Sequence, residues 1–312
     1  MFHRARLTPR PARWQPSGVS DLFTPLSPAQ KTDFQRRYLA YLRGRDGEPQ
    51  WQTHTFSVRE TFYRNLEQRP VRRTGAPVVH QDVFNRHHEQ YRPGEKLDEP
   101  TLWALCVAKT NRGERFGVEY AHRIGNVERD GDPDNPLTYI GIEEFYHTRI
   151  LRDALRVIGV EMEMLNPTLG QQFIIKTMAR LPKTMGYPII FCGEICGVAF
   201  FHLLLHKARE LFGDQPEPLA RIEGLFAQIM VDEVGHVHFA RSQMDAPGLA
   251  LAKRLLPLVA HGLVDGMPEY YQLFGRERLM QEILRADVDT AALPYPDRFL
   301  PFESAEPDRS AA

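Results

Sequence analysis

The sequence has few cysteines and no long uninterrupted apolar run, and each absence excludes a class of protein. Three cysteines among 312 residues are too few for a disulfide framework, which favours a reduced, intracellular protein. No stretch approaches the roughly 18 consecutive apolar residues of a typical membrane-spanning helix. The first residues also lack the apolar centre of a secretory signal. We therefore expect a cytoplasmic protein with no membrane partner.

Motifs for nucleotide-dependent chemistry are missing as well. The chain has no Walker, Rossmann or zinc-finger motif, and 39 Lys and Arg against 40 Asp and Glu leave a net charge of −1. The charge is uneven, because residues 1–97 contain 17 Lys or Arg and 9 Asp or Glu, whereas residues 98–312 contain 22 and 31. A basic front third can favour anionic partners or simply pack beside an acidic body. We expect the second, and no nucleic-acid partner.

Helical periodicity dominates the chain from Asp98 onward, whereas the alternation of apolar and polar residues that is typical of strands is absent. Four long helices and one shorter helix are expected there, at 99–124, 136–160, 188–212 and 217–243, and at 168–181. Flanking helices are expected before and after them, at 28–43, 54–68, 247–263 and 275–286. The expected class is all-α.

Three parts follow from this division, and we expect them to pack as one domain. Residues 1–97 comprise a basic N-terminal arm (1–27), two helices and a long loop at 70–97. Residues 98–245 form a four-helix bundle. Residues 246–312 add C-terminal helices and a proline-interrupted tail at 292–312.

Two segments contain the same Glu-x-x-His motif, whose spacing places both side chains on one face of a helix. The first pair is Glu144 and His147 in IEEFYHTRIL, and the second is Glu233 and His236 in VDEVGHVHFA. At about 100° per residue, each pair lies in the middle of an apolar stripe, where an unpaired carboxylate is costly. We expect both pairs to bind metal in the core. The alternative is buried polar groups hydrogen-bonded to each other.

The two remaining long helices each contribute one acidic candidate. A third Glu-x-x-His match, Glu119 with His122, lies on a helix side rich in arginine, which favours surface ion pairs. The one charged residue in the middle of that helix's apolar stripe is Glu114, which we favour as a ligand over Glu119. Glu194 is the one acid in the apolar segment 188–205. A metal would supply its counter-charge, although a protonated structural Glu194 is an alternative.

Each long helix thus provides one element of an ordered set: Glu114, Glu144 with His147, Glu194, and Glu233 with His236. Two Glu residues and two Glu-x-x-His motifs form the carboxylate-rich dinuclear site of ferritin-like four-helix bundles. Hard oxygen ligands with imidazole suit Fe or Mn and argue against structural zinc. We expect two Fe ions, with Mn or a mixed Fe/Mn pair as alternatives, and no catalytic residue beyond the metal site.

Over about 114–240, the pattern resembles the ferritin-like diiron-carboxylate superfamily. In its length and in its Asp-Glu-x-x-His-x-x-Phe-Ala ending at 232–240 it is similar to the oxygenase branch, which includes p-aminobenzoate N-oxygenase-like diiron oxygenases. In relatives, the acid before each ligating Glu reaches the His of the opposite motif, and metal-bound His normally donates to such a carboxylate. The resemblance therefore implies that Asp232 orients His147 and Glu143 orients His236. Two ordinary surface acids are the alternative.

Three positions depart from better-known members of the superfamily. Leu151 stands where a ribonucleotide reductase subunit usually has its radical tyrosine, Val198 where multicomponent hydroxylases have Thr, and Ile229 where the N-oxygenase type has a third His. N-oxygenation of arylamines therefore does not follow from the residues. Five site-facing side chains are expected either to line a substrate cavity or to belong to the core: Thr110, Tyr187, Val198, Phe201 and Phe226.

The resemblance implies an O₂-activating non-haem diiron oxygenase that hydroxylates or N-oxygenates a small organic substrate, with secondary metabolism as one setting. O₂ would be the co-substrate, and an electron-donor protein or another external reductant would be needed. A carrier protein and a homodimer are open as further partners. The alternatives are a ferroxidase or iron-handling ferritin-like protein, and an interaction protein whose metal site is only structural.

Overall fold

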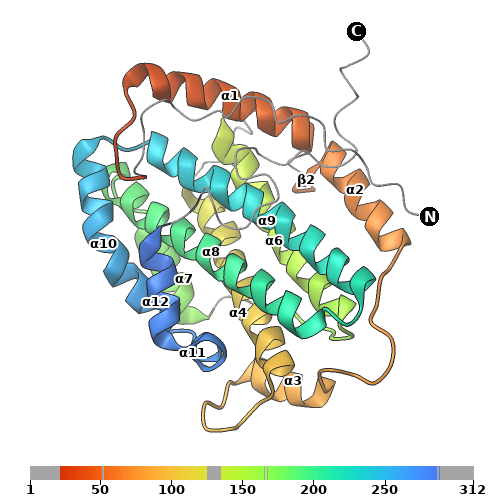
Figure 1. Ribbon diagram of the computed structural model, residues 1–312. Helices are drawn as coiled ribbons and strands as arrows, with labels where there is room; N and C mark the ends of the chain where they lie inside the picture. Colours follow the sequence, from red (N-terminus) through yellow and green to blue (C-terminus); the bar gives the residue numbers. More distant parts are fainter. Residues whose placement is uncertain are drawn as a thin grey trace.

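Helices make up nearly all the regular structure in the computed structural model (Figure 1). The structure describes residues 22–50, 53–124, 135–164, 166, 168–286 and 288. The expected all-α class is confirmed for these residues. The expected tail at 292–312 and residues 1–21 of the expected arm lie outside them. At the other end of that arm, Phe23 packs edge-to-face against Phe191, with ring centroids 5.7 Å apart.

Four long helices lie side by side and enclose the core: α4 (Glu99–Ile124), α6 (Pro136–Val157), α8 (Lys183–Phe212) and α9 (Pro216–Ser242). Helix α4 packs against α6 and α8, and α9 packs against α6 and α8. Buried hydrogen bonds join them, since Trp103 Nε1 donates to Leu204 O at 2.9 Å and Asn111 Nδ2 donates to Thr148 O at 2.6 Å. The inner faces of all four helices therefore meet in one interior.

Helix α8 begins earlier than its sequence indicates. It starts at Lys183 rather than at Pro188, so Pro188 lies inside the helix. Because proline lacks an N–H group, it removes one backbone hydrogen bond from the second turn, which the packing of this apolar helix outweighs. By length and composition alone α8 could cross a membrane, a test that the core helix of a soluble protein also passes, and 67% of its most apolar stretch is buried.

The N-terminal helices cover one side of the four long helices. Helix α1 (Pro28–Asp46) begins at the expected residue, where Gln30 N donates to Ser27 Oγ at 3.3 Å and Ser27 N donates to Gln30 Oε1 at 2.8 Å. This reciprocal capping satisfies two N–H groups of the first turn. Helix α1 packs against α6, α9 and α2 (Ser57–Gln68) (Figure 1). We call α1, α2 and the segment between them the N-terminal layer.

Four short elements were not expected from the sequence. The strands β1 (Pro49–Gln50) and β2 (Thr55–Phe56) pair antiparallel between α1 and α2, and they are too short to show alternation. The segment 70–97, expected to be a loop, contains α3 (Gln81–Glu89), which buries Phe84 and packs against α4. Helix α11 (Pro268–Phe274) spans less than two full turns and so shows little helical periodicity.

The remaining helices lie against the outer faces of α4 and α8. They are α7 (Leu169–Met178), α10 (Ala246–Asp265) and α12 (Arg276–Arg285). Helices α7 and α11 pack against α4, and α10 and α12 pack against α8. Together with the N-terminal layer, these helices surround the four long ones on several sides. The buried side chains in the interior include Glu144, His147, Glu233 and His236.

Candidate metal centre

The six expected ligand residues meet between the four long helices. Their ligand atoms form two groups, each with all atoms within 4.8 Å of one another. The first group is Glu114, Glu144, His147 and Glu233, and the second is Glu144, Glu194, Glu233 and His236. Glu144 and Glu233 belong to both groups. The arrangement therefore offers two adjacent positions for a metal ion, each with one imidazole and one carboxylate of its own and with two shared carboxylates.

Both imidazoles present the same nitrogen to the carboxylates. His147 Nδ1 lies 2.9 Å from Glu114 Oε2 and 3.2 Å from Glu233 Oε1. His236 Nδ1 lies 3.3 Å from Glu144 Oε1 and makes no hydrogen bond of normal geometry. The two ring centroids are 5.8 Å apart. An unprotonated Nδ1 on each ring would be free to bind a metal ion on the side where the carboxylates converge.

The other ring nitrogen of each histidine contacts an acid from the opposite motif. His147 Nε2 donates to Asp232 Oδ2 at 3.0 Å, and His236 Nε2 donates to Glu143 Oε2 at 3.0 Å. These are the pairings that the family resemblance implied, and both acids are buried rather than on the surface. With the proton on Nε2, Nδ1 retains the lone pair that a metal needs.

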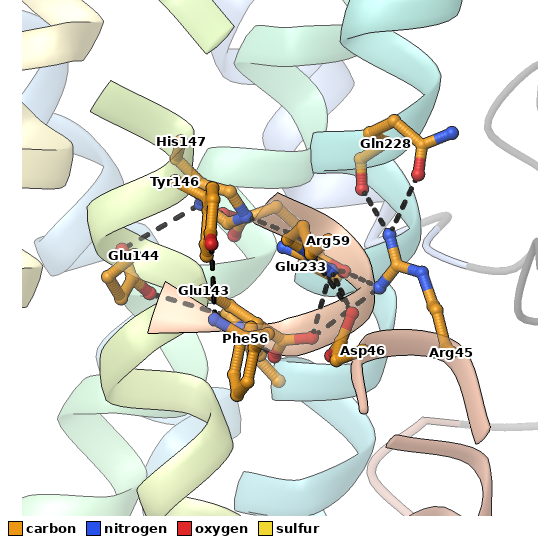
Figure 2. Close-up of polar contacts among 12 residues, drawn as sticks. Arg45, Asp46, Phe56, Arg59, Glu143, Glu144, Tyr146, His147, Gln228 and Glu233 are labelled. Carbon is orange, nitrogen blue, oxygen red and sulfur yellow. Dashed lines mark hydrogen bonds and ion pairs between the residues drawn. The ribbon is translucent and has the colours of Figure 1, made fainter. Parts of the chain in front are cut away.

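Two buried arginines hold the acids in place, and sequence reasoning did not identify them (Figure 2). Arg59 from α2 donates to Asp232 Oδ2 at 2.9 Å and to Asp232 Oδ1 at 3.0 Å, and it lies 3.4 Å from Glu143 Oε1. Arg45 from α1 also donates to Asp232 and reaches Gln228 O at 3.2 Å. The N-terminal layer thus closes the side of the centre on which the histidine Nε2 atoms lie.

A signal in the sequence could have found Arg59. At about 100° per residue, Arg59 lies within about 60° of Phe56, Tyr63 and Leu66, so it is the charged residue of an apolar stripe, as Glu114 is on its own helix. Arg45 carries the same signal, since it lies within about 60° of Phe34, Tyr38 and Leu42 on α1, but the helix expected at 28–43 ended before it.

The metal-free carboxylates are crowded enough to oppose their own ionisation. Burial and then repulsion from neighbouring carboxylates raise the pKa of Glu114 and of Glu233 well above the usual value. Burial also raises the pKa of Glu144. Burial lowers the pKa of His147 well below its usual range, aided by the positive charges of His236 and Arg59, so this imidazole is neutral. The two ligand groups together contain four carboxylates and two histidines, so their negative charge, when ionised, exceeds the positive charge available within them.

Glu143 and Asp46, two buried acids that contact Arg59, differ in pKa from the ligand carboxylates. Although burial acts to raise the pKa of Glu143, the hydrogen bond from His236 and the charges of Arg59 and Arg45 lower it well below its usual range. Glu143 is therefore ionised at neutral pH. Burial raises the pKa of Asp46 to about 7 in spite of both arginines, and Asp46 accepts a hydrogen bond from Arg59 Nε at 2.9 Å.

The donor set fits a pair of metal ions. Four ionised ligand carboxylates would balance two divalent cations charge for charge, and each position has one imidazole. Although burial acts to lower the pKa of His236, the carboxylates of Glu143, Glu144 and Glu194 raise it well above its usual value, so a metal ion would have to displace a proton from this ring. The ligand atoms lie in a buried interior, with His147 fully buried and with side-chain exposures of 11% for Glu114 and 18% for Glu194. Oxygen-rich sites of this kind suit Fe or Mn.

The other residues singled out in the sequence lie in the core or outside both groups. Glu119 belongs to neither group. Thr110 is buried, donates to Cys106 O at 3.0 Å and contacts the hydroxyl of Tyr270 from α11. The remaining four candidate cavity residues are buried members of the hydrophobic core: Tyr187, Val198, Phe201 and Phe226. Whether they line a substrate cavity stays a prediction.

The comparisons with known proteins provide no family. No family model matches the chain, and neither a curated protein nor a solved structure matches it.

Proposed function

We propose that this protein is an O₂-activating non-haem diiron oxygenase, built on a ferritin-like four-helix bundle, that oxidises a small organic substrate. The observation that supports this most strongly is the overlap of two ligand groups at Glu144 and Glu233. A single-metal structural site needs four ligands and gains nothing from a second, overlapping set. Two positions joined by shared carboxylates are suited to a pair of ions that act together.

Each side chain has a defined task in this proposal. Glu114 and His147 hold one ion, Glu194 and His236 hold the other, and Glu144 and Glu233 are shared. When bound, the reduced iron pair supplies the electrons that activate O₂.

The acids beneath the histidines keep each imidazole in the tautomer that binds metal. Asp232 and Glu143 accept hydrogen bonds from the histidine Nε2 atoms at 3.0 Å, and the charges of Arg59 and Arg45 help to lower the pKa of Glu143. The N-terminal layer excludes water from this side, since both arginine side chains are at most 1% exposed. A dry and fixed surrounding of this kind is what the protein contributes to metal-based oxidation.

Metal content and oxygen consumption test the proposal. We expect the purified chain to bind about two Fe(II) ions after anaerobic loading. The loaded protein should then consume O₂ faster when a reductant and an oxidisable compound from a panel of small aromatic amines and phenols are present. Glu114→Ala should reduce both metal content and O₂ uptake, whereas Glu119→Ala, on the same helix, should not.

Three other outcomes would lead to different functions. O₂ uptake that follows added Fe(II) and ignores every organic compound would indicate a ferroxidase. Two bound metals with no O₂ uptake would indicate a structural centre in an interaction protein. Failure to bind metal under any loading condition would refute the dinuclear site itself.

A further inference from the structure

Two glycines lie directly against the carboxylates that the two metal positions share. On α4, Gly117 stands three residues after Glu114, and a Cβ atom there would lie 2.7 Å from Glu144 Oε2. On α8, Gly197 stands three residues after Glu194, and a Cβ atom there would lie 3.0 Å from Glu233 Oε2. Both separations are well below the roughly 3.5 Å or more of comfortable non-bonded contact.

An imidazole lies beside the other oxygen of each shared carboxylate. The other oxygen of Glu144, Oε1, lies 3.3 Å from His236 Nδ1. The other oxygen of Glu233, Oε1, lies 3.2 Å from His147 Nδ1. Each shared carboxylate is therefore held between an imidazole on one side and the bare backbone of a neighbouring helix on the other.

The same relation occurs once in each half of the centre. Glu114-x-x-Gly117 on α4 contacts Glu144 of α6, and Glu194-x-x-Gly197 on α8 contacts Glu233 of α9. Gly113 on α4 and Gly193 on α8 make no such contact, since a Cβ atom at either position would meet nothing within 4 Å. Glycine is unfavourable inside a helix. At Gly117 and Gly197 the absence of a side chain leaves room for the carboxylate of a neighbouring helix.

We propose that Gly117 and Gly197 are positioning residues that set where the shared carboxylates stand. Without a side chain at either place, the carboxylates of Glu144 and Glu233 lie against the helix backbone, where each can reach both metal positions. A methyl group at Gly117 would push Glu144 toward His236 or out of its shared position. This inference rests on the proposed dinuclear centre and adds to it a steric requirement on two residues that bind nothing themselves.

Four alanine substitutions in the full-length protein test the inference. Anaerobic titration with Mn(II) or Co(II) should show that Gly117→Ala weakens binding by about tenfold or more or abolishes one of two sites, as loss of residues that support metal ligands commonly does. Gly197→Ala should have the same effect to a smaller extent, because its contact is longer. Gly113→Ala and Gly193→Ala should bind as the unmodified protein does.

Thermal melting of the metal-free variants distinguishes positioning from general damage. Alanine favours helix over glycine, so the metal-free melting temperatures of the control variants should stay equal or rise. If Gly117→Ala does not fold, Gly197→Ala, with its milder contact, still tests the proposal. A variant that melts normally without metal but binds metal poorly is the expected result.

A double variant tests the contact itself. Glu144→Asp shortens the side chain by one methylene and draws the carboxylate away from Gly117. The fold-loss of affinity caused by Gly117→Ala should therefore be smaller in the Glu144→Asp background than in the unmodified protein. Equal losses in both backgrounds would overturn the inference, as would normal binding of two metals by Gly117→Ala and Gly197→Ala. If the unmodified protein binds no metal, the proposed function falls and the inference falls with it.

Discussion

Asp232 is the side chain whose replacement tests the largest part of the proposed centre. It accepts a hydrogen bond from His147 and further hydrogen bonds from Arg45 and Arg59. Asp232→Asn keeps the size of the side chain and exchanges one acceptor oxygen for an NH₂ donor. An amide that accepts from the arginines must turn its NH₂ toward His147 Nε2, which then has to be unprotonated. The proton of a neutral His147 would move to Nδ1, the nitrogen that faces the carboxylates.

The opposite orientation of the amide is no better. Its NH₂ group would then face both guanidinium groups, which donate to the same oxygen of Asp232. In either orientation the neutral amide no longer balances the charge of the buried arginines. Removing one partner of a buried ion pair typically costs about 3–5 kcal/mol of unfolding free energy. The loss is expected at the low end of that range, because the amide oxygen still accepts one hydrogen bond. Loss of the partner that orients a metal-binding His typically weakens affinity by about 10–100-fold.

Two measurements check this expectation. Urea unfolding of metal-free Asp232→Asn should give a lower free energy of unfolding, and anaerobic Mn(II) titration should show weaker binding at one of two sites. Asp265→Asn is the matched control, because Asp265 forms an exposed ion pair with Arg276, which is worth about 1 kcal/mol or less. Unchanged stability together with unchanged metal affinity in Asp232→Asn would refute the argument about the tautomer and the arginines.

Two further predictions follow from the ligand groups. Glu194→Ala should leave the group of Glu114 and His147 intact, so elemental analysis should find about one metal per chain instead of two; retention of two ions would contradict the assignment. Because burial and mutual repulsion raise the pKa of Glu114, Glu144 and Glu233, metal must displace protons from them. Affinity should therefore fall as pH is lowered from 7.5 to 5.5, by about tenfold per pH unit for each proton displaced. Titrations that are independent of pH would contradict this.

The part of the structure that sequence could predict is the part controlled by helical periodicity. Apart from the start of α8, at Lys183 rather than Pro188, the long helices begin and end near their expected residues, because apolar stripes and capping residues such as Ser27 act locally. The same periodicity selected Glu114 over Glu119, and the structure places Glu114 with the other carboxylates. An acid in the middle of an apolar stripe is informative because burying it alone is costly.

Other features depend on contacts that periodicity does not describe. Helices α3 and α11 are short, so they show few repeats of an apolar pattern. Arg45 meets Glu143 and Asp232 because α1 lies across α6 and α9, which its own sequence does not reveal. Gly117 and Gly197 have no side chain for a helical wheel to place, and their importance appears only when the neighbouring carboxylates are present.

The contact between the N-terminal layer and Asp232 has a consequence for how the chain acquires its structure during synthesis. Arg59 and Asp232 are 173 residues apart in the sequence, so at roughly 5–20 residues per second the arginine is made about 9–35 s before its partner. Throughout that interval Arg45 and Arg59 lack Asp232, the acid that both contact, and burying them with only Asp46 and Glu143 as partners would be less favourable. We expect α1 and α2 to remain undocked until α9 has been made, so these two helices are synthesised before the four long ones but reach their places after them.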